Sequence, residues 1–322
     1  MKIYCIHHND NDGLCSAAIV KRMYKDDEIF FKSYNYNYDN DFIDFIAEAI
    51  VEADIIYIVD ISLNGLDEYF GSIINSDKTV WIDHHATSIA LEKKNPNLKK
   101  IKGFRSAKWS GAYLTYLWFI KNTMPSTMEH CGTDIETGDY DKIIPYVVKL
   151  VDDHDRFIHK YRESIDFLNG SQLYEGHDDP TSVFWDAVLG ADTLVLDDAI
   201  CRGNDITKYN HNRNEDIVKN AGTIRIVEED KATGTSHVYE GLGINYISNS
   251  LIFGDKFSSI TFGLVYHYDA SQSMWKYSIY SSDSDFSCNS IAEFFGGGGH
   301  KGAAGFSTKE LVIKNGTIHI TR

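Results

Sequence analysis

The sequence predicts an α/β protein with an N-terminal doubly wound, mainly parallel sheet flanked by helices, a linker helix, and a smaller C-terminal α+β domain. The first observation behind this is an alternation of short, apolar, β-prone segments with segments of helical length over residues 1–120. That alternation is typical of right-handed βαβ units, whose parallel sheet is covered on both faces. The second is that β-rich segments dominate from about residue 222 onwards. We therefore expect a first domain over 1–192, a linker helix over 193–221 and a second domain over 222–322.

The expected elements follow from local patterns in chain order. Apolar, β-branched runs predict strands of the first domain at 1–8, 28–36, 54–62, 79–85 and 99–104. Amphipathic or mostly apolar segments predict its helices at 14–23, 41–53, 66–76, 110–122 and 139–155. Residues 121–139 are polar with Gly and Pro, which predicts a loop insertion. In the second domain, strands are expected at 223–229, 236–243, 258–268 and 275–282, followed by a helix at 289–295.

Composition bounds the class of protein. The chain has 322 residues, 43% of them hydrophobic, which is ordinary for a globular protein of about two domains. It contains no apolar run near the ~20 residues that span a bilayer and no charged-then-apolar leader, so we expect a cytoplasmic protein without a membrane partner. The cysteines are scattered and never spaced as CxxC, which argues against a disulfide framework or a zinc–thiolate site. They are Cys5, Cys15, Cys131, Cys201 and Cys288.

The formal net charge of −16 argues against binding of long duplex nucleic acid, because such binding needs a basic groove. A small anionic substrate stays compatible with this charge if metal cations neutralise its site. An acidic surface that keeps the protein soluble is the simpler account of most of the charge.

Polar side chains follow the predicted strands at their carboxyl ends, where ligands bind in a doubly wound sheet. The stretch CIHHNDNDG ends the first strand, and VDIS, IDHH and VDDHD end later apolar segments. We expect His8, Asp10 and Asp12 to line one crevice with Asp60 and the IDHH cluster. This set of oxygen and nitrogen ligands without sulfur suits divalent manganese or magnesium, and the imidazoles favour manganese.

Each cluster alone has another explanation. An aspartate at a strand end is commonly a helix cap or turn residue, and a His-His pair is commonly surface or core polarity. The stretch VDDHD could be a helix end that runs into solvent, although acidic residues there oppose the helix dipole. The joint occurrence of these clusters at matching strand ends favours a metal site.

The Gly-rich stretch GGGGHKGAAGF near the end of the chain also has two interpretations. Such tracts are commonly flexible linkers. This one contains His300 and Lys301, lies inside a domain and directly follows a predicted helix. Because glycines let backbone N–H groups approach an anion closely, the stretch favours a clamp for phosphate or carboxylate.

Taken in order, HHNDNDG, VDIS, IDHH, VDDHDRF and GGGGHKGAAGF resemble the motifs of the DHH phosphoesterase superfamily with its DHH-associated C-terminal domain. The resemblance runs from residue 8 to about residue 306. It is most similar to the short branch of oligoribonucleases (nano-RNases), cyclic-dinucleotide phosphodiesterases and phosphoadenosine phosphate phosphatases. By this resemblance, 1–192 would be the metal-binding catalytic domain and 222–322 the substrate-binding domain.

The resemblance implies a site with two manganese ions, for which magnesium is a possible substitute. His8 and Asp10 would hold one ion, Asp12 and His84 the other, and Asp60 would bridge them. Asp153 would complete the second ion, with Asp155 and Asp152 left open as alternatives to it.

Further residues carry expected roles by the same resemblance. Asp83 would orient His84, and His85 would face the scissile phosphate. The far end of the substrate would be gripped by Gly297, Gly298, Gly299, His300 and Lys301. Many members have an arginine in a Ser-hydrophobic-Arg-Ser pattern where this chain reads SIYSS, with Tyr280 at that place. Tyr280 could stack on a base but cannot form a bidentate grip on phosphate.

These features predict hydrolysis of short oligonucleotides, cyclic dinucleotides or phosphoadenosine phosphate by two-metal activation of water. One alternative is an inorganic pyrophosphatase or polyphosphatase on the same core, although the superfamily's pyrophosphatases lack the Gly-rich ending. Another is a non-enzymatic nucleotide-binding module that uses Asp60 as a switch. Superfamily members often pair through the metal-bearing domain, so a homodimer is also left open.

Overall fold

A computed structural model of the chain describes residues 1–35, 40–63, 71, 73, 77–127, 134–190, 192–246 and 250–322. The chain divides into two compact units, Met1–Thr207 and Lys208–Arg322. The helix α10 (Thr193–Val218) runs across this division. The domain boundaries at 192 and 222 stay a prediction.

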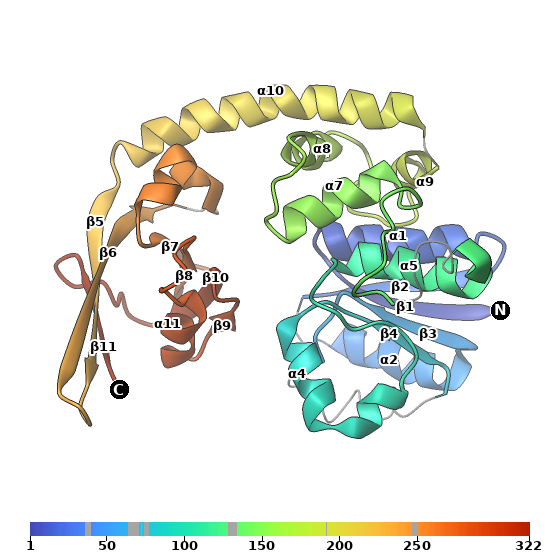
Figure 1. Ribbon diagram of the computed structural model, residues 1–322, viewed down its shortest axis with the longest axis horizontal. Coiled ribbons are helices and arrows are strands. Elements are labelled where there is room, and N and C mark those ends of the chain that lie inside the picture. The colour runs from blue at the N-terminus through green and yellow to red at the C-terminus, as the bar shows by residue number, and fades with distance from the viewer. Residues whose placement is uncertain are drawn as a thin grey trace. The chain divides into compact units, whose positions relative to one another are not determined.

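The first unit is built on a four-stranded sheet in the order β2-β1-β3-β4. All three strand pairings are parallel. Helices α1 and α5 lie on one side of this sheet and α2 lies on the other (Figure 1). The bounds are β1 (Lys2–His8), α1 (Asn11–Met23), β2 (Glu28–Tyr34), α2 (Asn40–Glu52), β3 (Ile55–Val59), β4 (Thr79–Ile82) and α5 (Gly111–Thr123). The predicted α/β class with a flanked parallel sheet is confirmed.

Alternate residues of β1 enter two separate cores, because successive side chains of a strand point to opposite faces. Ile3 and Cys5 belong to a core that also contains buried residues of α1 and α5. Tyr4 and Ile6 belong to a second core, which contains residues of α2. Other helices that the structure describes in this unit are α4 (Ala86–Lys94), α7 (Tyr146–Asp155), α8 (Glu163–Ser171) and α9 (Val183–Leu189).

The strand predicted at 99–104 is wrong. Residues Pro96–Lys100 form a 3₁₀ helix, η1, and the chain then meets β4 only at isolated bridges such as Val80 with Lys102. A Cβ at Gly103 would lie 1.9 Å from the Trp81 carbonyl oxygen, and its φ is +119°. This glycine therefore bends the segment too sharply for a regular strand.

Two other predictions fall partly outside the described residues. Of the helix expected at 66–76, the structure describes only residues 71 and 73. In the predicted insertion at 121–139, residues 128–133 lie outside the description, and α5 extends into its beginning. The later part of this insertion contacts the residues just before α5, since Trp109 Nε1 donates a hydrogen bond to the Ile135 carbonyl at 2.9 Å.

The second unit contains a seven-stranded mixed sheet in the order β11-β5-β6-β7-β8-β10-β9. Its elements are β5 (Gly222–Asp230), β6 (Thr235–Asn245), η2 (Ser250–Ser259), β7 (Gly263–Asp269), β8 (Met274–Tyr280), α11 (Cys288–Phe294), β9 (Gly298–Gly299), β10 (Ala303–Thr308) and β11 (Thr317–Thr321). Helix α11 contributes Ile291 and Ala292 to the core beneath this sheet. The predicted α+β character of this part is confirmed. Across the described residues, no helix is both long and apolar enough to cross a membrane.

Candidate metal centre

The turn between β1 and α1 brings the first two candidate ligands together. His8 ends β1, and its Nδ1 lies 2.7 Å from Asp10 Oδ2. Asp10 is the N-cap of α1, and its Oδ1 accepts a hydrogen bond from Gly13 N at 2.9 Å. A Cβ at Gly13 would lie 2.2 Å from the His8 carbonyl oxygen, so only glycine permits this close turn. Burial raises the pKa of Asp10, but hydrogen bonding to His8 and Gly13 outweighs it and lowers that pKa to about 2.

Asp60 follows β3 and is 1% exposed. Its φ is +57°, a left-handed conformation that aspartate tolerates better than most residues. Asp60 Oδ2 lies 3.9 Å from His8 Nδ1, and Asp60 Oδ1 lies 3.3 Å from His84 Nε2. Within the described part of the chain, no group donates a hydrogen bond to Asp60 Oδ1. Burial, and then the neighbouring carboxylates of Asp12 and Asp10, raise the pKa of Asp60 well above its ordinary value.

Asp12 lies in the first turn of α1 and joins this helix to the beginning of α5. Its Oδ2 accepts a hydrogen bond from Gly111 N at 2.6 Å, and its Oδ1 accepts one from Ala112 N at 2.9 Å. A Cβ at Gly111 would lie 2.7 Å from Asp60 Cβ and 3.0 Å from Asp12 Oδ2. The missing side chain of Gly111 therefore makes room for two carboxylates. Burial raises the pKa of Asp12, and the charge of His84 opposes part of this rise.

The IDHH turn after β4 gives its three polar residues different surroundings. Asp83 Oδ1 accepts a hydrogen bond from the backbone N–H of His84 at 2.8 Å. It accepts a second one from Nδ1 of the His85 ring at 2.7 Å. Asp83 Oδ2 accepts a bond from Ser88 Oγ. Burial raises the pKa of Asp83, but the charge and hydrogen bond of His85 outweigh this, so the net shift is downward.

The prediction that Asp83 orients His84 stays a prediction. Asp83 holds the ring of His85 and only the backbone of His84. The His84 ring instead turns to the other carboxylates, with Nε2 at 3.5 Å from Asp155 Oδ2 and 3.9 Å from Asp12 Oδ2. Burial lowers the pKa of His84, which keeps its imidazole in the neutral form that ligates metal.

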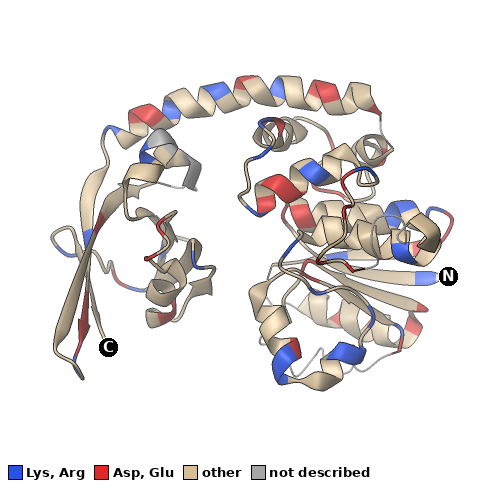
Figure 2. Cartoon of the chain, in the orientation of Figure 1, with Lys and Arg blue, Asp and Glu red and all other residues tan. Residues whose placement is uncertain are grey.

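The VDDHD stretch ends α7, whose C-terminal turns carry acidic residues (Figure 2). Asp152 accepts hydrogen bonds from Ser110 N at 2.7 Å and from the Arg156 guanidinium. Asp153 accepts bonds from Lys160 N at 2.7 Å, Tyr161 N at 3.1 Å and Ser164 Oγ at 2.8 Å.

Of these acidic residues, only Asp155 lies among the other candidate ligands. The preference for Asp153 as a ligand stays a prediction, and the engagement of both its oxygens by the segment after α7 favours the alternative Asp155. Asp155 Oδ2 is buried and receives no hydrogen bond from any residue that the structure describes. Burial, and then Asp12 and Asp10, raise the pKa of Asp155 well above its ordinary value.

The candidate ligands form three overlapping groups. In each group the ligand atoms lie within 4.8 Å of one another. The groups are His8, Asp10 and Asp60; Asp12, His84 and Asp155; and Asp60, His84 and His85. Asp60 Oδ1 and Asp155 Oδ2 are buried and receive no hydrogen bond from the described residues, and the set contains oxygen and nitrogen atoms without sulfur. Such a set fits hard divalent cations.

The predicted substrate-binding residues lie in the second unit. The Gly-rich stretch contains the short strand β9, which pairs with β10 as part of the sheet. Gly297 N donates to the Ala292 carbonyl at 2.9 Å, and His300 N donates to the Ala303 carbonyl at 2.7 Å. These two N–H groups are therefore engaged within the unit rather than directed to an anion.

Tyr280 ends β8, where it pairs with Ala303 of β10 and Gly263 of β7. Burial raises the pKa of its hydroxyl. The roles of Tyr280, Gly297, Gly298, Gly299, His300 and Lys301 in binding substrate stay predictions.

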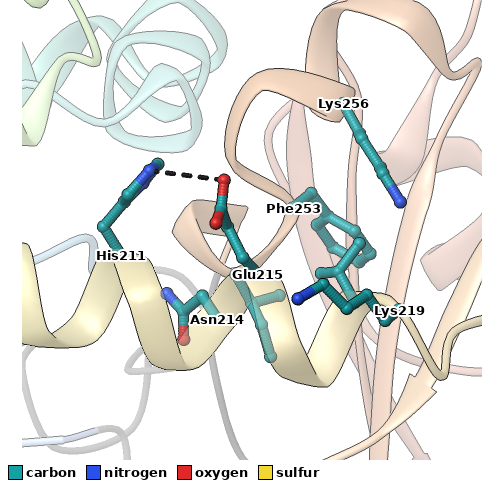
Figure 3. Close-up of a pocket in the computed structure, with 8 residues that line it drawn as sticks. His211, Asn214, Glu215, Lys219, Phe253 and Lys256 are labelled. Atoms are coloured by element: carbon teal, nitrogen blue, oxygen red, sulfur yellow. Dashed lines mark ion pairs between the residues drawn. The ribbon is translucent and has the colours of Figure 1, made fainter.

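A pocket of about 250 Å³ lies elsewhere in the second unit, between α10 and η2 (Figure 3). Val218, Ile252 and Phe253 supply its apolar lining, and Lys219 and Lys256 lie on either side of Phe253. None of the residues predicted from the sequence lines this pocket.

The parallel sheet with carboxylates and imidazoles at its carboxyl edge defines the class first, an α/β protein with a candidate metal site. Residues 2–134 match the model of the DHH family, N-terminal domain. This match covers the first part of the chain and agrees with the resemblance to the DHH superfamily that the sequence predicted.

Known proteins add the following comparisons. No curated protein matches the chain. The structure of RecJ in complex with Mn²⁺ from Thermus thermophilus is 14% identical, with a TM-score of 0.52 over 99% of this chain and 53% of that one. Another structure, exonuclease RecJ bound to manganese, is 15% identical, with a TM-score of 0.50 over 95% of this chain and 86% of that one. At these identities the likeness supports the fold alone.

Proposed function

We propose that this chain is a manganese-dependent phosphoesterase that hydrolyses short oligonucleotides or small nucleotides, such as cyclic dinucleotides or phosphoadenosine phosphate. The observation that carries the proposal is the position of Asp60. Its carboxylate is fully buried and belongs to two of the groups of candidate ligands. A buried carboxylate without a hydrogen-bond donor on Oδ1 is costly unless a cation neutralises it.

In the proposed site, His8 and Asp10 would hold one ion, Asp12, His84 and Asp155 would hold the other, and Asp60 would contribute to both. Two divalent ions in such a site lower the pKa of a water molecule and offset the charge of the phosphoryl group. Magnesium can substitute for manganese because the site offers oxygen ligands to a hard cation.

The remaining residues of the IDHH turn position the substrate in this proposal. Asp83 fixes the imidazole of His85 through Nδ1, and His85 presents Nε2 to a phosphoryl oxygen. The Gly-rich stretch and Tyr280 of the second unit are proposed to hold the far end of the substrate. The net charge of −16 supports short substrates, because long nucleic acid would be repelled.

The proposal is tested by incubating the purified protein and Mn²⁺ with a dinucleotide, a pentanucleotide, a cyclic dinucleotide, adenosine 3′,5′-bisphosphate and pyrophosphate. Asp60→Asn should lower the rate on the preferred nucleotide by more than the about 10–100-fold typical of outer-shell changes. Asp197→Asn, which changes an exposed aspartate of α10, is the matched control and should leave the rate unchanged. Cleavage of pyrophosphate alone would favour the pyrophosphatase alternative, and cleavage of none of the substrates would contradict the proposal.

A further inference from the structure

The segment directly after the candidate ligand Asp155 exposes a large aromatic side chain. Phe157 is 53% exposed, although it belongs to a residue type that is usually buried. Only one residue separates it from Asp155, so the two Cα atoms lie at most about 7 Å apart. An exposed phenyl ring is thus tethered beside the metal centre.

The backbone holds this ring in an unfavourable conformation. The φ angles of Phe157 and His159 are +54° and +55°, in the left-handed region that bulky residues rarely adopt. Ile158 N donates a hydrogen bond to the Asp153 carbonyl at 2.9 Å, and the Asp153 carboxylate accepts the bonds from Lys160 and Tyr161 described above. The segment is therefore fixed at both ends, and this kind of strain tends to persist at functional sites.

Neighbouring side chains extend the aromatic surface. The ring of His154 stacks with Phe157 at a centroid distance of 6.3 Å, and His159 meets Phe157 edge-on at 5.9 Å.

The side chain between Asp155 and Phe157 is directed elsewhere. The Arg156 guanidinium bonds the Asp152 carboxylate and lies 5.3 Å from the centre of the Trp109 ring. Arg156 therefore braces the helix ends, whereas residues 157–160 are exposed and Phe157 is the exposed phenyl ring among them.

We propose that Phe157 is a stacking platform for a nucleobase of the substrate while the adjoining phosphoryl group occupies the metal centre. This inference rests on the proposed function and narrows it to substrates that carry a base. A base lies one sugar away from its phosphate, which matches the short tether between Phe157 and Asp155. Every nucleobase offers a π-face, so a phenyl platform recognises nucleotides without selecting a sequence.

The kinetic test compares Phe157→Ala and Phe157→Trp on a dinucleotide and on the corresponding abasic dinucleotide. Stacking on an aromatic side chain is worth about 1–3 kcal/mol per base, so Phe157→Ala should raise KM for the dinucleotide about 5- to 150-fold. Its rate on the abasic substrate should not change, and Phe157→Trp should retain the low KM. Leu194→Ala is the matched control, because it removes a different exposed apolar side chain of the same unit, one that is 79% exposed.

A binding test keeps the inference separate from the proposed activity. The fluorescence of 2-aminopurine riboside 5′-monophosphate is quenched when its base stacks, so wild-type protein with Mn²⁺ should quench it and Phe157→Ala should not. Equal KM values on the dinucleotide for wild type and Phe157→Ala, or equal quenching, would overturn the inference but leave the phosphoesterase proposal intact. Absence of cleavage by the wild type would instead contradict the proposed function. The quenching result alone would then show whether Phe157 stacks on a base.

Discussion

At the scale of single residues, Asp153 and Asp155 lie two positions apart in α7 and have opposite surroundings. The Asp153 carboxylate receives two backbone N–H groups and a hydroxyl, which satisfy its charge within the fold. Asp155 Oδ2 lies 3.5 Å from His84 Nε2 and has other carboxylates nearby. Asp153 therefore stabilises the chain, whereas Asp155 costs stability in the absence of a cation.

We expect Asp155→Asn and Asp153→Asn to have different effects. Asp155→Asn should weaken Mn²⁺ binding by about 10-fold or more in calorimetric titration, with the free energy of unfolding of the metal-free protein unchanged or raised. Asp153→Asn should lower that free energy by about 1–3 kcal/mol in urea, because buried donors lose part of their acceptor. The opposite pattern would show that Asp153 is the ligand.

At the scale of elements, the N-terminus of α5 supports the metal centre. Its first amides bind the Asp12 carboxylate, and Ser110 N binds Asp152, which Arg156 also holds. An anion at a helix N-terminus is stabilised by the aligned peptide dipoles. α5 thus sets the position of Asp12 relative to the end of α7.

Gly111→Ala should weaken Mn²⁺ binding about 10–100-fold, as for other changes to residues that position ligands. The new Cβ would overlap Asp60 Cβ and crowd Asp12 Oδ2. Helix propensity alone would favour alanine at this position, with a free energy of unfolding higher by about 0.5–1 kcal/mol. Gly222→Ala, where a Cβ would have no heavy atom within 4 Å, is the control and should bind Mn²⁺ like the wild type. Unchanged affinity in Gly111→Ala would show that the two carboxylates move apart without cost.

At the scale of the whole molecule, the metal centre opposes folding until its charge is neutralised. The folded-state pKa values of Asp12, Asp60 and Asp155 are raised, first by burial. Groups with raised pKa values bind more protons in the folded than in the unfolded chain. Their contribution to stability is therefore present below the ordinary aspartate pKa and is lost as pH rises through the raised values.

Mn²⁺ should therefore raise the Tm more at pH 8 than at pH 5. The ion replaces protons that Asp12, Asp60 and Asp155 retain at low pH, and at 100 times its Kd it adds about 2.7 kcal/mol to the free energy of unfolding. Scanning calorimetry of the chelator-treated protein, with and without Mn²⁺ at both pH values, measures this difference. A shift that is equal at both pH values, or larger at pH 5, would contradict the assignment of these carboxylates as the ligands.

The predictability of the structure differed between elements. The alternation of strand and helix patterns in residues 1–120 correctly predicted the parallel sheet, because an apolar strand such as 79–82 has one local pattern. The predicted strand at 99–104 was wrong, because Gly103 bends against Trp81, a contact that no local pattern contains. Short elements such as η1, α8, α9 and β11 were not predicted, since their weak patterns depend on tertiary packing.

The sequence by itself determined the fold class and the gathering of acidic and imidazole side chains at one sheet edge. These follow from periodicity and from polar residues at strand ends, which are local features. Only the tertiary structure places Asp155 rather than Asp153 beside His84, brings Asp83 to the His85 ring and reveals the amides of Gly111 and Ala112 at Asp12. These choices depend on atoms brought close from distant segments, and the distances that separate a ligand from its neighbour exist only in the folded chain.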